Sequence, residues 1–276
     1  MARNSDAVKA QWRTFLATAA VICLTLAAGP GRVAGAEVPA GVTPAATAFG
    51  PGEKMTFSIG YGPVTAGEAT IEVVGLTMYQ GHACYELQSK ANSNRFFSSF
   101  YKVRDKIVSY LDVEFLYSRY FHKRLREGDY RKTVEISFDH ENEVAHYADG
   151  NQYDIMSGIQ DVLSALYFVR NLDLGSGDTY SLVAHSSRKT YDLRVLVHGK
   201  EMVTVPAGTF ECFVVEPVLQ GEGLFKHEGK ITIYVTDDQY RVPVLVKTKV
   251  PVGSIDVELK EYRPGKPLRA RPAFTH

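Results

Sequence analysis

The chain has 276 residues, of which 45% are hydrophobic and 22% charged, a globular composition sufficient for one large all-β domain or two smaller ones. The 31 Lys and Arg residues balance the 31 Asp and Glu residues, so the sequence lacks the basic excess that a nucleic-acid partner requires. No Walker loop, dinucleotide-binding fingerprint or G-x-S-x-G elbow occurs, so the sequence carries none of the motifs of those enzyme classes.

Residues 1–36 have the layout of a secretory signal peptide. A basic segment precedes an apolar run over residues 15–28, and Ala34 and Ala36 supply the small side chains that a signal peptidase accepts. The run of about 14 residues is shorter than the ~20 that span a bilayer as a helix, and no later segment is apolar enough to do so. We therefore predict a Sec-exported periplasmic protein of Gram-negative type that starts at Glu37, with no transmembrane segment after cleavage.

The next residues predict a short leader followed by a sheet. Residues 37–52 are rich in Pro, Ala, Thr and Gly without a period, which is typical of a flexible leader. From Glu53 onward apolar and polar residues alternate, which predicts a hairpin with one wet face. Strand-like runs recur at short intervals up to residue 148, among them one over residues 97–104, and the spacing is that of an antiparallel meander.

One segment breaks this alternation. Between Asp154 and Arg170 the apolar residues recur at helical spacing, and Ser157 is placed to cap the start. We predict one α-helix there. Strands resume at Thr179 and continue to Tyr262, with residues 190–198 and 200–205 predicted as two separate strands.

The segments before and after the helix echo each other. "GHACYELQSK" and "GTFECFVVEP" share a glycine, a cysteine before an aromatic residue, and alternating apolar positions. The predicted fold is therefore mostly β: a curved antiparallel sheet or open barrel-like meander of two related halves bridged by one α-helix. A single β-rich domain is expected over residues 53–262, followed by a basic, disordered tail over residues 263–276.

Cys84 and Cys212 occupy matching places in the two echoing segments. An oxidising compartment joins them if the fold brings their Cα atoms within ~7 Å, and otherwise both remain buried thiols. The sequence leaves both outcomes open.

The adjacent carboxylates Asp237 and Asp238, with Arg241 close behind, are the most conspicuous candidates for catalysis. Neighbouring side chains on a strand point to opposite faces, which keeps the two carboxylates from converging on one substrate atom. Aspartate at a strand end followed by polar residues is typical of a β-turn. We favour a turn in which an aspartate pairs with Arg241, and an acid/base pair is the alternative.

No other residue set favours catalysis or metal binding. Asp161 and Ser164 share a helical face, but no histidine lies one turn away, and the eight histidines lack the spacing of a zinc site. We predict no catalytic residue, no cofactor and no metal, and hence no enzyme. An unrecognised hydrolase that uses Asp161, Asp237 or Asp238 is a remote alternative.

Aromatic residues gather between residues 96 and 121 on both strand parities. Some of them must face away from the main core, or the sheet must be apolar on both sides, as in curved sheets that hold a small ligand. Ordinary packing is the alternative. The interleaved Lys and Arg residues of this segment either line a rim that meets anionic head groups or protect a sheet edge. The predicted ligand-binding residues are Phe96, Phe97, Phe100, Tyr101, Tyr110, Tyr117 and Tyr120.

Four segments between residues 52 and 262 resemble the DUF3108 family of exported bacterial proteins: "GEKMTFSIGYGPVTAGEATIEV", "GIQDVLSALYFVRNLDLGSGD", "VPAGTFECFVVEP" and "LFKHEGKITIYVTDDQYRVPVLVKTKVPVGSIDVEL". The resemblance implies an exported, mostly antiparallel β domain. It implies no reaction, because the function of this family is unknown. Its landmarks in this chain are Asp161, Ser164, Tyr167, Arg170, Asp237, Asp238 and Arg241.

These observations favour a periplasmic binding or carrier protein whose sheet, capped by the helix, holds an apolar ligand such as a lipid or acyl chain. The alternative is an envelope structural or assembly factor that acts through contacts with an envelope protein, with its basic tail touching anionic lipid or polymer.

Overall fold

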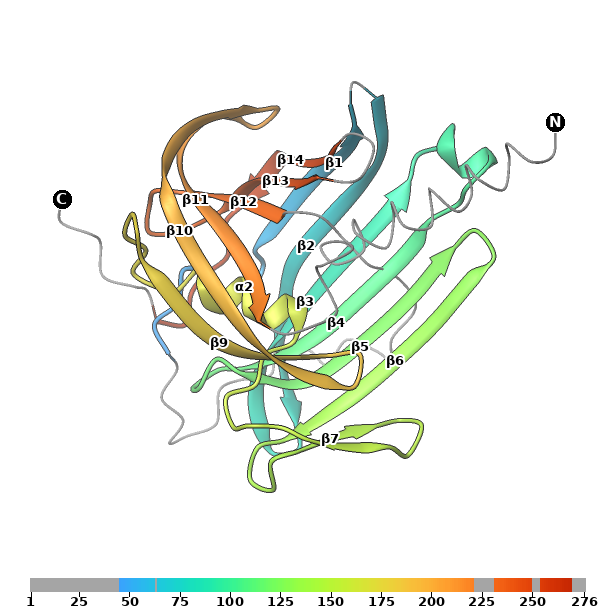
Figure 1. Ribbon diagram of the computed structural model, residues 1–276, viewed down its shortest axis with the longest axis vertical. Coiled ribbons are helices and arrows are strands. Elements are labelled where there is room, and N and C mark those ends of the chain that lie inside the picture. Colours follow the sequence, from blue (N-terminus) through green and yellow to red (C-terminus); the bar gives the residue numbers. More distant parts are fainter. Residues whose placement is uncertain (1–44, 63, 221–230, 250–253, 270–276) are drawn as a thin grey trace.

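The computed structural model describes residues 45–62, 64–220, 231–249 and 254–269. The predicted signal peptide and residues 270–276 of the predicted tail lie outside these ranges. Within them the fold is one 14-stranded antiparallel sheet with a single α-helix, α2 (Val162–Val169), and one 3-10 turn, η1 (Phe97–Ser99) (Figure 1).

The strands follow one another in the sheet almost in sequence order. The eight strands before the helix are β1 (Lys54–Tyr61), β2 (Val64–Tyr79), β3 (His82–Ser93), β4 (Arg104–Asp112), β5 (Ser118–Glu127), β6 (Tyr130–Asp139), β7 (Val144–Tyr147) and β8 (Gln152–Asp154). The six after it are β9 (Thr179–Ser186), β10 (Lys189–Val205), β11 (Gly208–Gln220), β12 (Ile231–Thr236), β13 (Pro243–Lys249) and β14 (Ser254–Arg263).

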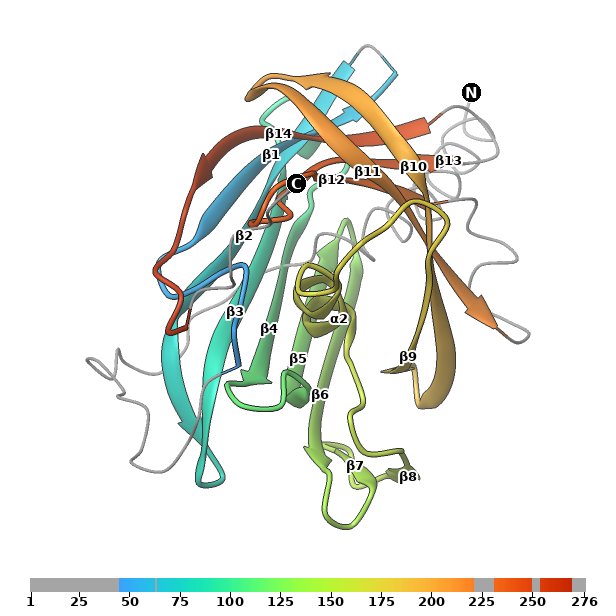
Figure 2. The ribbon, with the colours of Figure 1, turned by 90° about the vertical axis from the view of Figure 1, so that its left-hand side faces the viewer.

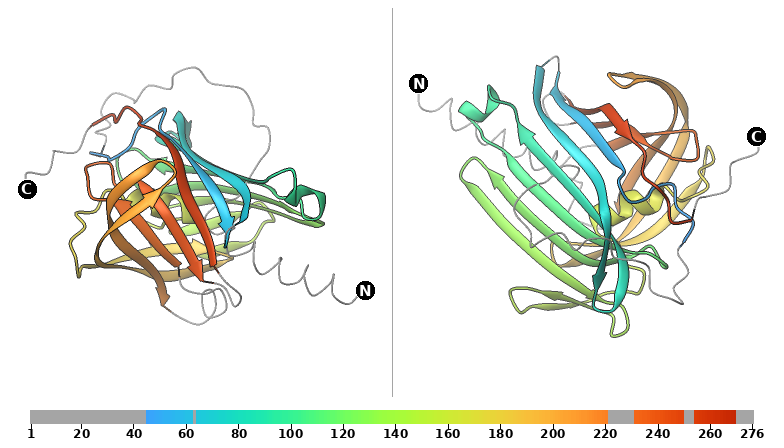
Figure 3. Two further views of the ribbon diagram at one scale, coloured as in Figure 1. Left: turned by 90° about the horizontal axis from the view of Figure 1, so that it is seen from above. Right: turned by 180° about the vertical axis from the view of Figure 1, so that it is seen from behind.

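The sheet is an up-and-down meander whose first and last long strands pair. Its order runs from β8 down to β1, then from β14 down to β9, so that β1 and β14 are the only hydrogen-bonded neighbours that are not consecutive strands in the described chain. The sheet curls from β6 round to β11, and its open seam lies between β8 and β9 (Figure 3). The predicted mostly-β, barrel-like meander with one bridging helix is confirmed.

Alternation along the strands separates an inner from an outer face. On β1 the apolar Met55, Phe57 and Ile59 are buried, whereas Thr56 and Ser58 between them are half-buried. The first set belongs to the same hydrophobic core as Leu163 and Tyr167 of α2, and we call this the inner face. It forms a continuous hydrophobic core across β1 to β6, β13 and β14.

The helix α2 lies inside the curl of the sheet, between β3 and β4 on one side and β9 to β11 on the other (Figure 2). Its Tyr167 packs toward β3 through Phe49, while Ala165 joins a second apolar cluster formed with Val195 on β10 and Phe213 on β11. Both flanks of the helix are therefore buried, which explains why its sequence is almost entirely apolar.

The seam between β8 and β9 is bridged by backbone and side-chain bonds. The backbone N–H of Gln160 donates to the carbonyl of Val183, and the N–H of His185 donates to the carbonyl of Gln160, both at 2.8 Å. The Tyr147 hydroxyl lies 2.8 Å from His185 Nε2. Burial lowers the pKa of His185 to about 4, so this imidazole is neutral near pH 7. The segment that holds α2 thus completes the circumference where strands do not pair.

The two halves of the sheet share a hairpin geometry, as their sequence echo predicts. β2 has a bulge at Gly75 and β10 has one at Gly199, and each bulge lies opposite the residue two positions after a cysteine. Cys84 and Cys212 are both buried and free, and each thiol donates to the carbonyl of the residue two before it at 3.7 Å. The two-thiol alternative describes this structure.

Three predicted elements differ from those observed. Residues 97–104 do not form a strand, because η1 occupies their first part. Residues 190–198 and 200–205 belong to one bulged strand, β10. The helix is eight residues long and is capped by Asp161, not Ser157, because residues 155–160 leave helical geometry, with a φ of +81° at Gly158.

The predicted leader and tail are partly ordered. Thr47, Ala48 and Phe49 are buried, and Phe49 packs edge-on against Tyr85 at 5.3 Å. The Thr47 N–H donates to the carbonyl of Arg269 in the predicted tail at 3.0 Å. Order in this chain therefore begins before Glu53 and extends past β14, because these two segments pair and cover the end of the core.

Candidate functional site at one end of the sheet

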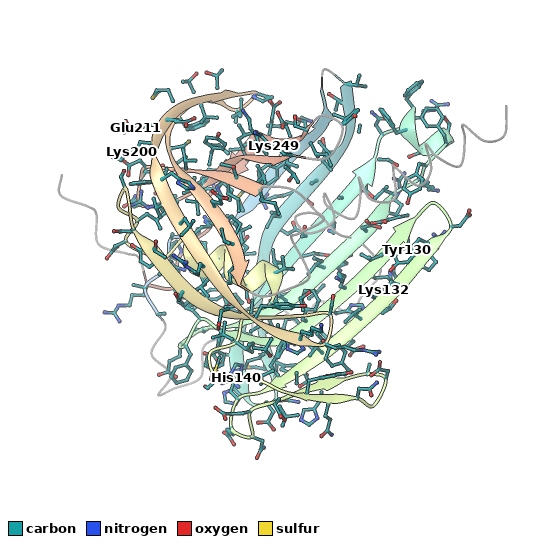
Figure 4. The ribbon with its side chains drawn as sticks, viewed as in Figure 1. Tyr130, Lys132, His140, Lys200, Glu211 and Lys249 are labelled. Atoms are coloured by element: carbon teal, nitrogen blue, oxygen red, sulfur yellow. The ribbon has the colours of Figure 1, made fainter. Side chains whose placement is uncertain are left out.

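The two ends of the curled sheet differ in chemistry. The turns β1–β2, β3–β4 and β5–β6 share one end, which we call the η1 end; the turns β2–β3, β4–β5 and β6–β7 form the opposite end. Figure 4 labels Tyr130 at the η1 end of β6 and His140 just beyond its other end. The predicted ligand-binding residues do not form one lining, because the structure distributes them over both ends and the outer face.

Three of the predicted residues form a cluster at the η1 end. The rings of Phe96, Phe97 and Phe100 contact one another edge to face, with centroids 5.0 to 5.9 Å apart. Tyr101 lies beside them, and its ring fills the space in which a side chain at Gly128 would stand. This cluster joins the β3–β4 connection to the neighbouring β5–β6 turn.

Two more of the predicted residues lie on the outer face of the sheet. Tyr110 and Tyr120 stack with centroids 4.9 Å apart, and Tyr79, which the sequence analysis did not single out, completes a trio. Burial raises the pKa of both Tyr110 and Tyr120. The seventh residue, Tyr117, lies at the opposite end, stacked on His140 at 3.7 Å and on Phe115 at 5.4 Å. These three tyrosines cannot share a ligand with the phenylalanine cluster.

The helix landmark Asp161 is a buried cap. Its carboxylate accepts the N–H groups of Leu163 and Ser164, and the hydroxyls of Ser109 and Ser118 donate to its other oxygen at 2.6 and 2.5 Å. Ser164 completes a capping box by accepting the Asp161 N–H at 2.9 Å. Burial raises the pKa of Asp161. These four bonds tie the start of the helix to Ser109 on β4 and Ser118 on β5.

The last helix landmark, Arg170, forms a buried ion pair. Its guanidinium donates to both oxygens of Glu53 at 2.7 Å, and both side chains are fully buried. The guanidinium also donates to the Tyr240 carbonyl and lies over the rings of Phe49 and Tyr167, at 5.6 and 5.0 Å from their centroids. This pair joins the end of α2 to the start of β1 and to the β12–β13 turn.

Asp237 and Asp238 lie in that turn, as predicted. One oxygen of Asp238 accepts the Thr236 hydroxyl and the N–H groups of Tyr240 and Arg241, which is the bonding of an Asx turn. Asp237 pairs with Arg241 at 2.7 Å and with Lys200. The pairing with Arg241 is confirmed, and the two carboxylates serve different local contacts.

A buried acid pair lies near the η1 end and was not predicted from the sequence. Asp105 on β4 and Glu127 on β5 are 1% and 5% exposed, and their strand positions make them diagonal neighbours on the inner face. Burial, followed by the neighbouring Glu127, raises the pKa of Asp105 to about 8, against the opposing effect of the Arg126 N–H bond. Burial and the neighbouring acid thus both favour the protonated form of Asp105.

Only strand pairing brings these two acids together, which is why spacing did not reveal them. A signal was present nonetheless. Asp105 occupies an inward position in the alternation that continues with Ile107 and Leu111, and a charged residue at such a position is unusual.

Two further findings concern metal binding and membrane spans in the described residues. No three His, Cys, Asp or Glu side chains there lie close enough together to bind a metal ion. No helix in the same part of the chain combines the length and apolarity needed to cross a bilayer.

In the part of the chain that the structure describes, the fold is that of a barrel-like antiparallel protein built around a single internal helix. The chain belongs to the family described as protein of unknown function DUF3108, which matches residues 56–260. The predicted family is thus confirmed. None of the curated proteins is significantly similar to the chain in sequence.

Solved structures share the fold at low identity. A beta-barrel-like protein of the domain of unknown function DUF1849 from Brucella abortus aligns with a TM-score of 0.53 at 9% identity, over 77% of this chain and 97% of that one. A DUF1089 family protein from Pseudomonas aeruginosa aligns over 80% of this chain and 97% of that one, at 12% identity and a TM-score of 0.33. The first of these supports the barrel-like architecture alone.

Proposed function

We propose that this protein is an exported, non-enzymatic carrier in the cell envelope that binds an amphiphilic ligand, such as a lipid or acyl chain, on the inner face of its sheet at the η1 end. The observation that carries the proposal is the buried Asp105–Glu127 pair. A charged pair removed from water is costly, and such groups concentrate at sites that bind or react.

The surroundings of the acid pair support binding rather than catalysis. The inner face around it combines apolar side chains, several of them small, with two lysines: Ala69, Ala91, Ile107 and Leu125 lie there, and strand register places Lys123 and Lys132 on the same face. A mainly apolar lining with few polar groups is the usual composition of a small-molecule site. A protonated Asp105 beside Glu127 would donate one hydrogen bond and accept others, which suits a hydroxyl, amide or amine head group.

The position of α2 distinguishes the two ends of the inner face. The helix is tied to the part of the inner face toward the opposite end, through Ser109, Ser118 and the Phe49–Tyr85 contact. We assign ligand binding to the part of the same face toward the η1 end.

Native mass spectrometry of the protein purified from an envelope fraction, followed by solvent extraction, tests this proposal. We expect a discrete added mass that is released as lipid. The variant Ala91→Leu should remove this mass while lowering the free energy of unfolding by less than about 1 kcal/mol, because it fills space that the ligand occupies.

A matched control is Ala83→Leu, on the same strand and the same face but toward the opposite end. Overpacking there should cost roughly 1–3 kcal/mol and leave the bound mass in place. An apo mass for the wild-type chain, together with equal destabilisation by both variants, would show that the η1 half of the inner face is ordinary core.

A further inference from the structure

The η1 end presents three phenylalanines in one short connection. Phe96 and Phe100 are 67% and 62% exposed, and with Phe97 they form a single apolar cluster. Large apolar side chains that cluster on a surface mark a contact with a partner or a membrane.

Hydrogen bonds hold this connection in one conformation. The Asn94 amide donates to the Thr65 carbonyl at 2.7 Å and accepts the Phe97 N–H at 2.9 Å. The Ser93 hydroxyl accepts the Val103 N–H at 2.9 Å. The rings therefore project from an ordered loop that is anchored to the start of the neighbouring strand β2.

The charges around the loop are mostly positive. Exposed basic side chains come from the connection itself and from the adjacent β5–β6 hairpin: Arg95, Lys102, Arg126, Arg131 and Lys132. A hydrogen bond from the Gly128 N–H to the Lys102 carbonyl holds the two turns together, and within the β5–β6 hairpin Arg131 donates to the Gly128 carbonyl. Asp129 is the one exposed acid in these two turns.

The opposite end carries the reverse charge. Its turns over residues 113–117 and 140–143 contain the exposed acids Glu114, Glu141 and Glu143 and no Lys or Arg. It also contains an exposed phenylalanine, Phe115, which is 57% exposed and stacks on Tyr117. β4 alone, nine residues long, separates the two ends by about 30 Å.

We propose that the η1 loop is a membrane-contact site, which docks this end of the sheet onto the surface of a bilayer with anionic head groups. The phenylalanines enter the interface, and the surrounding Lys and Arg side chains meet the head groups. The acidic opposite end is repelled, so the protein attaches in one orientation. This inference does not depend on a bound ligand, because it concerns attachment alone.

Cosedimentation with vesicles of phosphatidylcholine containing 30% phosphatidylglycerol, compared with pure phosphatidylcholine, tests the site. We expect the wild-type chain to bind the anionic vesicles and to dissociate as salt rises. Phe96→Ser combined with Phe100→Ser should lower the partition coefficient by at least about tenfold, since each ring contributes most of its exposed apolar area. Arg95→Gln with Lys102→Gln should weaken binding to the anionic vesicles only.

Phe115→Ser is the matched control, because it removes a phenylalanine of similar exposure from the acidic end. All variants share the same chain from Glu37 onward apart from the substituted residues, so any contribution of the rest of the chain cancels in the comparison. Equal binding by the double phenylalanine variant and the wild-type chain, with unchanged circular dichroism, would overturn the proposal. Equal losses in the Phe115→Ser control would do the same.

A direct readout is the emission of a tryptophan placed in the loop. The one tryptophan of the sequence, Trp12, lies in the predicted signal peptide, so Phe100→Trp introduces the only tryptophan of the chain from Glu37 onward. Its emission should shift to the blue on anionic vesicles and be quenched by brominated lipid. Phe115→Trp should remain in water, and a blue shift at Phe115 without one at Phe100 would reverse the assigned orientation.

Discussion

Replacing Arg170 by methionine tests whether the ion pair at the end of α2 stabilises the fold. The substitution removes two bonds of 2.7 Å to Glu53 and two to the Tyr240 carbonyl, as well as the contacts with two aromatic rings. Of the described contacts, Glu53 then keeps the Tyr262 hydroxyl at 3.1 Å. Breaking a buried pair from one side typically costs 3–5 kcal/mol, so we expect a loss of about 4 kcal/mol. That is a large share of the ~5–15 kcal/mol that stabilise a domain.

Urea unfolding followed by circular dichroism at pH 7 measures this loss. The double variant Arg170→Met with Glu53→Gln should recover part of the stability, because it no longer buries an unpaired carboxylate. Arg188→Met, which breaks the exposed pair with Asp149, serves as the control and should leave the midpoint unchanged. A cost below about 1 kcal/mol for Arg170→Met would refute the view that burial makes this pair important.

Two further predictions concern buried titratable groups. The folded pKa of Asp105, about 8, lies above its unfolded value near 4, so the folded chain holds a proton that the unfolded chain lacks, and stability should fall as pH rises through this window. His185 opposes this trend only below pH 6.5, so Asp105→Asn should flatten the decline between pH 6.5 and 8, and an unaltered slope would mean that Asp105 is ionised in the folded protein. Burial raises the pKa of Cys84 and of Cys212 to about 12, so both thiols should react with a disulfide reagent at pH 8 only after denaturation, whereas an intact mass lower by two protons would reveal a disulfide.

The sequence predicted the architecture well because strand alternation is a local signal. One buried face can be predicted from the strand's own alternation alone, as with Met55, Phe57 and Ile59. The predicted boundaries of strands and helices were wrong where tertiary contacts determine them. Phe97 favours a strand by its own propensity, but the bond from its N–H to Asn94 turns the chain there instead.

The candidate site was less accessible to prediction from the sequence. The phenylalanines of the cluster are adjacent in sequence, so composition indicates them, but their pattern predicts a ligand lining, whereas the structure places them at an exposed end. Asp105 and Glu127 meet only through the β4–β5 register, which periodicity does not reveal. Glu53 and Arg170 are 117 residues apart and likewise required the fold.

The pairing of β1 with β14 has a consequence for how the chain acquires its structure. Every other pairing in the sheet joins consecutive strands and can form as soon as the second strand emerges, but Glu53 beside β1 meets Tyr262 of β14 across 209 residues. Until the last strand arrives, β1 keeps a free edge that invites pairing with other chains. The sheet therefore closes at β1 only once residues 254–263 are available, and a chain that ended before residue 254 would leave that edge unpaired.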